Sequence, residues 1–348
     1  MAGSEGRRWG RRDSKGRAPE QESQPQPQPG EALEGVVLGA GEQGSGGQRP
    51  GDQGPGGQRA GEQRAGEQAS AEQWTPDAEP VPEPVRVDVF TGPESAFFAT
   101  SSLVFGPTEA VLVDTQLTRA AGSELAEWVA GRTRRLTAVV ITHPHPDHYF
   151  GTEEILRLFP GTPVYAVPEV IEGIIATGLA KVARWQPVFG DDLTSTPVVP
   201  GPLPGRRLWV DGAGLDVLAL GQGDCTACSV VHVPGADTVV AGDLVYNGTH
   251  LWTAETTPAQ RADWLANLEL VRGLGASRVV AGHRAPGQGD GAAEVLGFTA
   301  GYLREFDLRL AQHPDDAAAL VRAMNERYAE LTLPGLLELS AEAATARG

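Results

Sequence analysis

The chain has 348 residues and a formal net charge of −17, with 28 Lys and Arg against 45 Asp and Glu. A nucleic-acid partner needs clustered basic residues that contact phosphates, so this charge argues against one. No apolar run approaches the length of a membrane span, and the arginines between positions 7 and 12 are not followed by the apolar stretch of an export signal, so we expect a cytoplasmic protein that does not enter a membrane.

The first 84 residues are of low complexity, with Gln-Pro repeats and two copies of one five-residue sequence. Such a segment cannot bury enough apolar surface to offset the entropy lost on ordering, so we expect residues 1–84 to form a disordered tail. A functional linker and a wrongly assigned start codon are the alternatives. The apolar pattern that follows predicts a domain over residues 85–310, and later helical stretches predict an extension over residues 311–348 that packs on it.

Apolar runs and helical periodicity predict the elements of this domain in chain order. Strands are expected at 85–90, 97–105, 110–113, 136–141, 162–166, 207–210, 215–220, 229–233, 238–241 and 278–281. Helices are expected at 119–130, 152–158, 169–185 and 259–274, and Pro334 predicts the start of the last one. Two blocks of strands, each with helices, indicate an α/β or α+β fold.

The most informative stretch is 143–148, which reads His-Pro-His-Pro-Asp-His and follows the apolar run 136–141. It holds three of the seven histidines of the chain. Imidazole nitrogens and a carboxylate oxygen are the ligands that zinc and similar divalent ions prefer. Without a cation, such crowding would add desolvation cost with no structural return. The stretch therefore predicts a metal-binding loop with the ligands His143, His145, Asp147 and His148.

This loop resembles the HxHxDH signature of the metallo-β-lactamase-fold hydrolases. Three further strand ends resemble the family in the same order, with Asp114 after 110–113, a Gly-Asp pair at Asp243 and a Gly-His pair at His283. The resemblance covers about residues 85–310 and implies a four-layer αββα metallo-β-lactamase-like sandwich. It also implies that Asp243 and His283 are metal ligands, and that Asp114 accepts an N–H from a ligand histidine. A turn or loop-capping carboxylate is the alternative for both aspartates.

One position departs from the family pattern. Where the family places a further His after a Gly, this chain has Gln222. An amide oxygen is a poor zinc ligand beside imidazole, so the metal position with His143 and His145 would lack its third nitrogen. The resemblance therefore implies one doubtful Zn²⁺ site there and one firm site, made by Asp147, His148, Asp243 and His283. Manganese and iron are the alternatives to zinc.

A divalent ion in this loop would lower the pKa of a bound water to about 7 and polarise an electrophile. We expect Asp147 to orient that water. Tyr246 and His250 flank the ligands in sequence and are further catalytic candidates, as is Tyr149, with packing as the alternative for each. Cys225 and Cys228 form one C-x-x-C, which we interpret as two small residues near a strand, since one pair supplies only half a zinc site.

The predicted function is a zinc-dependent hydrolase that acts on an ester, thioester, lactone or related bond of a small-molecule substrate. A metal-poor pseudoenzyme or binding module on the same fold is the alternative, because Gln222 replaces an expected ligand. A di-iron redox protein would need a further carboxylate in the first motif, so we rank it third.

Deletion of residues 1–84 should leave the melting temperature and the metal content of the protein unchanged, because this segment lacks core-forming residues. Thermal unfolding and elemental analysis of the shortened and full chains measure this. A melting temperature many degrees lower in the shortened chain would show that the tail packs on the domain.

Overall fold

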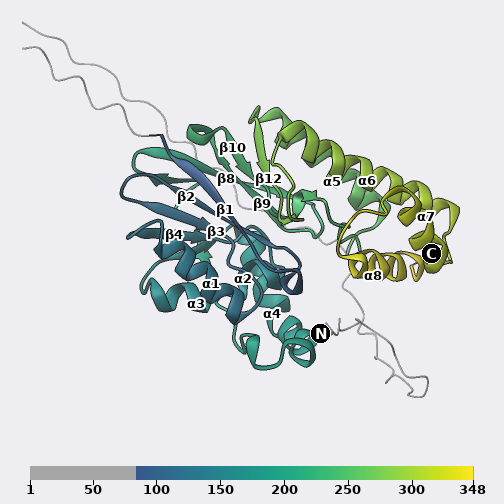
Figure 1. The fold of residues 1–348 in the computed structure, drawn as a ribbon, viewed down its shortest axis with the longest axis horizontal. Coiled ribbons are helices and arrows are strands. Elements are labelled where there is room, and N and C mark those ends of the chain that lie inside the picture. Colours follow the sequence, from purple (N-terminus) through teal and green to yellow (C-terminus); the bar gives the residue numbers. More distant parts are fainter. Residues whose placement is uncertain (1–83, 348) are drawn as a thin grey trace, which may run out of the picture. The chain divides into compact units, whose positions relative to one another are not determined.

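The computed structural model describes residues 84–347, so the expected N-terminal tail lies, apart from its last residue, outside the described residues. Within the described range, two β-sheets are stacked between helices that cover their outer sides (Figure 1). The layers thus follow the order helix, sheet, sheet, helix. This arrangement confirms the predicted four-layer αββα sandwich of mixed α/β class.

The first sheet has the strand order β1-β2-β3-β4-β5-β6. Its strands are β1 (Arg86–Thr91), β2 (Thr100–Phe105), β3 (Ala110–Val113), β4 (Leu136–Val140), β5 (Val164–Ala166) and β6 (Gly201–Pro202). The pairs β1–β2 and β2–β3 are antiparallel, whereas β3 to β6 run parallel. Because β3 and β4 are parallel neighbours, the residues that follow them meet at one edge of the sheet.

The second sheet has the order β12-β10-β9-β8-β7. Its strands are β7 (Arg207–Val210), β8 (Ala213–Gly221), β9 (Cys228–Val233), β10 (Thr238–Val240) and β12 (Arg278–Val280). Only β10 and β12 pair in parallel, so the residues after these two strands also lie at a common edge. A short parallel pair, β11 (Tyr246–Asn247) with β13 (His283–Arg284), joins the two segments beyond that edge.

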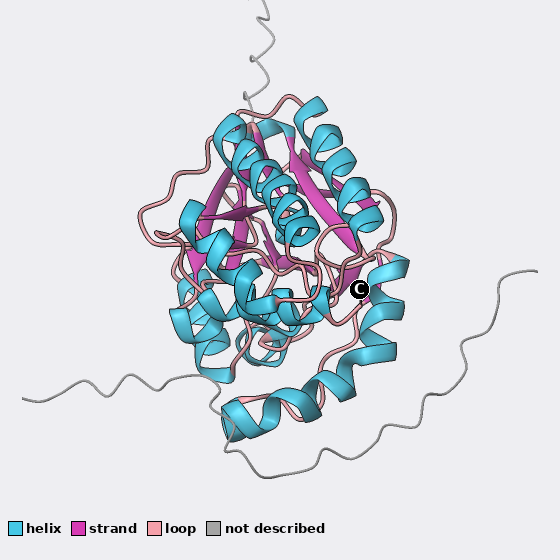
Figure 2. Ribbon diagram, turned by 90° about the vertical axis from the view of Figure 1, so that its right-hand side faces the viewer, coloured by secondary structure: helices cyan, strands magenta, loops and turns pink. Residues whose placement is uncertain are grey.

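Helices cover the outer face of each sheet. The first sheet carries α1 (Arg119–Ala130), α2 (Pro146–Tyr149), α3 (Thr152–Leu158) and α4 (Pro168–Phe189). The second carries α5 (Pro258–Gly273) and α6 (Ala292–Gln312), and α7 (Ala317–Arg327) and α8 (Pro334–Thr345) pack against α6. Figure 2 faces this second helical side and shows helices in front of the strands. None of the described helices is long and apolar enough to cross a membrane.

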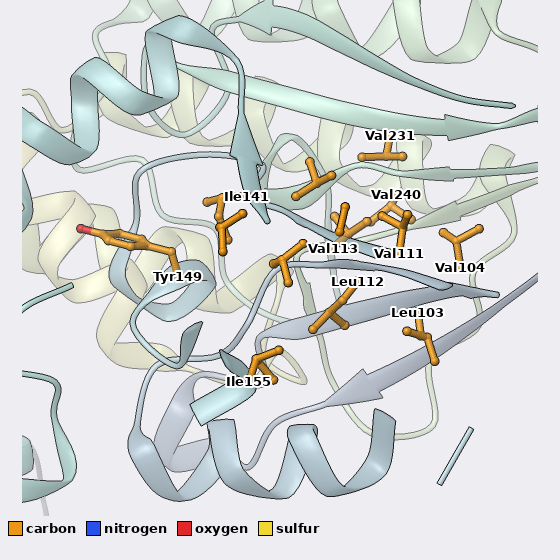
Figure 3. Close-up of a cluster of buried hydrophobic side chains, with 14 of the residues drawn as sticks. Leu103, Val104, Val111, Leu112, Val113, Ile141, Tyr149, Ile155, Val231 and Val240 are labelled. Atoms are coloured by element: carbon orange, nitrogen blue, oxygen red, sulfur yellow. The ribbon is translucent and has the colours of Figure 1, made fainter. Parts of the chain in front are cut away.

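The central strands are apolar on both faces because both faces are buried. In β10, Val240 belongs to the core that includes Val111 and Val113 of the first sheet, whereas Val239 belongs to the core under α5 and α6. In β9, Val231 likewise belongs to the first of these cores and its neighbour Val230 to the second. Figure 3 shows Val231 and Val240 above Val111 and Val113, in the apolar layer between the sheets. Because both faces of these strands are packed, the ends of the strands, which carry the polar residues described below, are held in position.

The expected strand at 97–105 begins later than the sequence suggested. Phe97 and Phe98 have φ angles of 62° and 52°, which no β-strand adopts, and a 3-10 turn at Glu94–Ala96 precedes them. The strand β2 therefore starts at Thr100. Tertiary contacts set this conformation, since the amide of Arg284 donates to the Phe98 carbonyl.

The last two helices share a core with α6. Leu320 and Met324 of α7 and Leu337 of α8 are fully buried in the cluster that also contains Phe306. The division predicted between residues 310 and 311 falls inside α6, and the proposed domain boundaries remain a prediction.

Candidate metal centre

The polar residues that the sequence singled out follow strand ends at one side of the sandwich. Asp114 follows β3, and the 143–148 loop follows β4. Asp243 and His283 follow the parallel strands β10 and β12, each after a Gly. A fifth segment, the loop 222–227 between β8 and β9, reaches the same place. The topology thus brings five segments, which span 170 positions of the sequence, to one buried site.

One group of four buried residues could hold an ion. Its members offer ligand atoms that all lie within 4.8 Å of one another, and they are His143, His145, Asp224 and Asp243. His145 Nδ1 is 2.8 Å from Asp224 Oδ2, and His143 Nε2 is 3.5 Å from Asp243 Oδ2. Two imidazoles and two carboxylates from three separate segments thereby lie close together.

A second group lies against the first. Asp147, His148 and His283 also offer atoms within 4.8 Å of one another. Asp243 contacts this group too, with its Oδ1 3.1 Å from His148 Nε2 and its Oδ2 3.0 Å from His283 Nε2. His283 Nε2 is also 3.3 Å from Asp147 Oδ2. Asp243 therefore lies between the two groups and can serve both.

Buried atoms that make no hydrogen bond indicate that these residues fit a cation. Among the described residues, His143 Nε2, His148 Nε2 and Asp243 Oδ1 are buried and make no hydrogen bond. Each such atom would cost about 1–3 kcal/mol if nothing satisfied it. The rings of His143 and His148 also lie with their centroids only 4.2 Å apart. Nitrogen and carboxylate donors of this kind suit a divalent ion, which would satisfy all three atoms together.

The charges of the site also favour a cation. Burial lowers the pKa of His148, but the carboxylates Asp243, Asp147 and Asp114 outweigh it and raise that pKa well above its usual value. Burial raises the pKa of Asp243, yet the neighbouring histidines, His283 first, hold it well below the usual range. The surroundings therefore stabilise positive charge next to these carboxylates.

Two hydrogen bonds from outside the groups orient ligand rings. Asp114 Oδ2 accepts from His148 Nδ1 at 2.9 Å and from the Thr142 hydroxyl at 2.7 Å. His283 Nδ1 donates to the Phe97 carbonyl at 2.7 Å. Such bonds select the tautomer that leaves the other ring nitrogen free for a metal. The left-handed conformation that puts the Phe97 carbonyl in place thus has a role at the site.

Tyr246 links the two groups. Its hydroxyl donates to Asp243 Oδ2 at 2.8 Å and lies 3.2 Å from Asp224 Oδ2. Its ring stacks on His283, with centroids 5.1 Å apart and planes 14° apart. Burial and both carboxylates raise the pKa of this hydroxyl well above its usual value, so it remains a donor.

Sequence reasoning missed Asp224. It concentrated on Gln222, but the Gln222 amide donates to the carbonyls of Gly223 and Cys225 within its own loop. The side chain of this loop that reaches His145 belongs to Asp224, two positions later and fully buried. An aspartate in a Gly-rich turn before a buried strand was the available signal.

Glu255 was also missed. Its Oε1 is 3.4 Å from Nε2 of His145, the ring nitrogen that faces away from Asp224. Burial raises the pKa of Glu255, but His145, Lys181 and Trp252 outweigh it and lower that pKa to about 2. Lys181 donates to the carbonyl of Pro144, which stands between His143 and His145 in the sequence. Lys181 therefore lies next to the metal loop.

The remaining two candidates have other contacts. His250 is buried with its Nδ1 2.9 Å from the Tyr302 hydroxyl of α6, and burial lowers its pKa to about 4. Tyr149 is buried, and its hydroxyl makes no hydrogen bond to the described residues. Neither residue belongs to the two groups, and their catalytic assignment stays a prediction.

Comparisons with known proteins identify the family and the fold. The family model of the metallo-beta-lactamase superfamily matches residues 95–283. A metallo-beta-lactamase family protein from Thermus thermophilus has the same fold, with 22% identity and a TM-score of 0.53 over 74% of this chain and 91% of that one. The DIM-1 metallo-beta-lactamase and a metallo-beta-lactamase from Pontibacter korlensis are 20% and 22% identical, each over 64% of this chain and over 98% and 95% of their own, both with TM-scores of 0.47. No curated protein matches the chain.

We expect Asp224→Asn to weaken binding of one divalent ion by tenfold or more, because the amide removes the negative charge that faces His145. Gln222→Ala is the matched control from the same loop and should leave the affinity unchanged. Zinc titration of both variants by calorimetry measures this. A weakened Gln222→Ala beside an unaffected Asp224→Asn would assign the ligand to Gln222 instead.

Proposed function

Since the chain belongs to the metallo-β-lactamase superfamily, we propose that it is a zinc-dependent hydrolase acting on an ester, thioester, lactone or related bond of a small molecule. Family membership and the histidine–aspartate cluster support a metal-dependent hydrolase in general. Zinc and the class of bond are part of the proposal. The observation that carries it is the set of buried histidine and aspartate atoms that make no hydrogen bond and lie against one another at the strand ends.

The proposal includes two metal positions. The first would be held by His143, His145 and Asp224, and the second by Asp147, His148 and His283, with Asp243 between them. Asp224 supplies the third donor that Gln222 does not offer, so we no longer treat the first position as doubtful. A carboxylate oxygen is a harder ligand than an imidazole nitrogen, so manganese and iron remain alternatives to zinc at this position.

A bound divalent ion would lower the pKa of a water to about 7 and polarise the bond to be cleaved. The protein must then accept the proton of that water, and Asp147 is suited to this. Its carboxylate is 12% exposed, more than that of Asp243, which is 2% exposed. It contacts His283 and His148, and it is the most exposed carboxylate of the two groups, so it is the one most open to a substrate.

Other side chains hold the site in shape. Tyr246 donates to Asp243 and lies within hydrogen-bond distance of Asp224, which fixes the spacing of these two carboxylates. Glu255 faces the outer nitrogen of His145 and can fix that ring. We therefore propose Tyr246 as a positioning residue. His250, buried against Tyr302, has no part in this scheme.

The alternative function is a metal-poor binding module, and the reason to consider it is that Gln222 stands where the family places a histidine. Asp224 weakens this reason, because it supplies the first metal position with a carboxylate from the same loop. An ion-free cluster of this size would also leave buried atoms unsatisfied. The hydrolase is therefore the better supported function.

Asp147→Asn should lower kcat by about 10²–10⁴-fold, because general-base catalysis contributes on that order. It should also weaken the ion held with His148 and His283, because an amide replaces a carboxylate donor, so turnover is compared at a metal concentration that saturates both proteins. Turnover is measured with ester, thioester, lactone and phosphodiester substrates, in the presence of zinc, manganese or iron. Asp263→Asn, on the exposed side of α5, is the matched control and should retain full activity. Metal-loaded parent protein that turns over no substrate of the panel would favour the binding module.

A further inference from the structure

The two cysteines lie directly behind the proposed metal ligand Asp224. Cys225 Sγ and Cys228 Sγ are 3.6 Å apart, and both thiols are free. The Cys228 thiol donates to Asp224 Oδ1, with the sulfur 3.6 Å from that oxygen. The other oxygen of the same carboxylate, Oδ2, faces His145 and Tyr246. One carboxylate therefore connects the thiol pair to the metal centre.

The two cysteines differ in how firmly they are held. Cys228 is the first residue of β9 and pairs with Gly221 of β8. The next residue, Ser229, donates twice to the carbonyl of Thr142, just before the metal loop. Cys225 lies in the loop between the strands, next to Asp224, and is not part of a strand. A movement that brings the sulfurs together must therefore come mainly from Cys225, and Asp224 would move with it.

We propose that Cys225 and Cys228 are an oxidation site for hydrogen peroxide, and that the disulfide formed there weakens metal binding at the position of His143, His145 and Asp224. A disulfide holds its sulfurs at about 2.05 Å, so the pair must close by about 1.5 Å from its present separation. Closure also removes the S–H that now donates to Asp224. The metal half of this proposal rests on the proposed function.

The chemistry balances with peroxide alone. Cys225 is 6% exposed and Cys228 2%, so a small oxidant reaches Cys225 first. Its sulfur attacks one peroxide oxygen, the O–O bond breaks, and the departing hydroxide leaves as water with the thiol proton, which gives a sulfenic acid. Cys228 sulfur then displaces the sulfenic hydroxyl, which leaves as a second water with the Cys228 proton. Two thiols lose two electrons, and the peroxide gains them.

The loop has little room in which to absorb this closure. A Cβ on Gly223 would lie 2.7 Å from the Cys228 sulfur, and the Gly223 amide already donates to the Cys225 carbonyl. The Gln222 side chain donates to that carbonyl as well. Because Asp224 is fully buried, a shift of its backbone moves the carboxylate relative to His145 rather than into solvent.

The test starts from full-length protein, reduced and then treated with hydrogen peroxide. Two free thiols should become none by alkylation under denaturing conditions, and the intact mass should fall by two hydrogens. These are the only two cysteines of the chain, so a monomer can form no other disulfide. Two persistent free thiols, a sulfinic acid or a disulfide-linked dimer would overturn the oxidation site.

The second measurement is zinc titration of the reduced, oxidised and re-reduced protein. Oxidation should lower the affinity of one zinc by about 10- to 100-fold, the scale on which supporting residues act on metal affinity, and dithiothreitol should restore it. Cys228→Ser keeps a hydroxyl donor for Asp224 but cannot form the disulfide, so peroxide should leave its zinc affinity unchanged. A disulfide with unaltered zinc binding would overturn the coupling.

The outcomes also separate this inference from the proposed function. Reduced protein that binds no zinc would refute the proposed metal centre, and with it the coupling, while the thiol count would still decide whether the oxidation site exists. Normal zinc binding with no disulfide would refute only the oxidation site.

Discussion

The structure depends on the burial of four carboxylates beside four imidazoles at one side of the sandwich. Burying a carboxylate is costly unless it is paired and hydrogen-bonded, and like charges at this distance oppose one another. Each member of the cluster meets an imidazole, a hydroxyl or a main-chain group, and the members are Asp114, Asp147, Asp224, Asp243, His143, His145, His148 and His283. The cluster still holds buried atoms without a hydrogen bond, and a divalent cation is the partner that its charges and donors fit.

The same constraint explains the glycines that precede two of these residues. A Cβ on Gly282 would collide with Asp243 Oδ1 and with the main chain of Gly242. Gly242 has a φ of 50°, and a Cβ there would press on the Thr142 side chain. Asp243 and His283 can approach each other because Gly282 has no side chain, whereas the missing side chain of Gly242 leaves room for Thr142, the hydroxyl of which donates to Asp114. The Gly-Asp and Gly-His pairs are thus requirements of close packing as well as sequence signals.

Much of this site could be predicted because its residues stand at the ends of strands buried on both faces. The apolar run before His143 and the valines before Asp243 and His283 form buried parallel strands. The direction and register of these strands determine where the side chains that follow them lie. The position of Asp224 could not be predicted in this way, because contacts with a distant helix determine the conformation of its loop. Asn267 of α5 donates to the carbonyls of Leu220 and Gln222, and no local pattern encodes that contact. The contact of His250 with Tyr302, 52 positions away, is likewise not encoded in any local pattern.

The C-terminal helices bear on the chemistry through Tyr246. The segment after Tyr246 is held by α8 and by the residues before it, since the His250 amide donates to the Thr332 carbonyl and the Thr253 amide donates to Ser340. On its other side, the Tyr246 amide donates to the Thr299 hydroxyl of α6. Tyr246 in turn fixes the spacing of Asp243 and Asp224. The helices α6 and α8 therefore help to position Asp243 and Asp224 through Tyr246, and the helical layer on this side supports the cluster as well as the core.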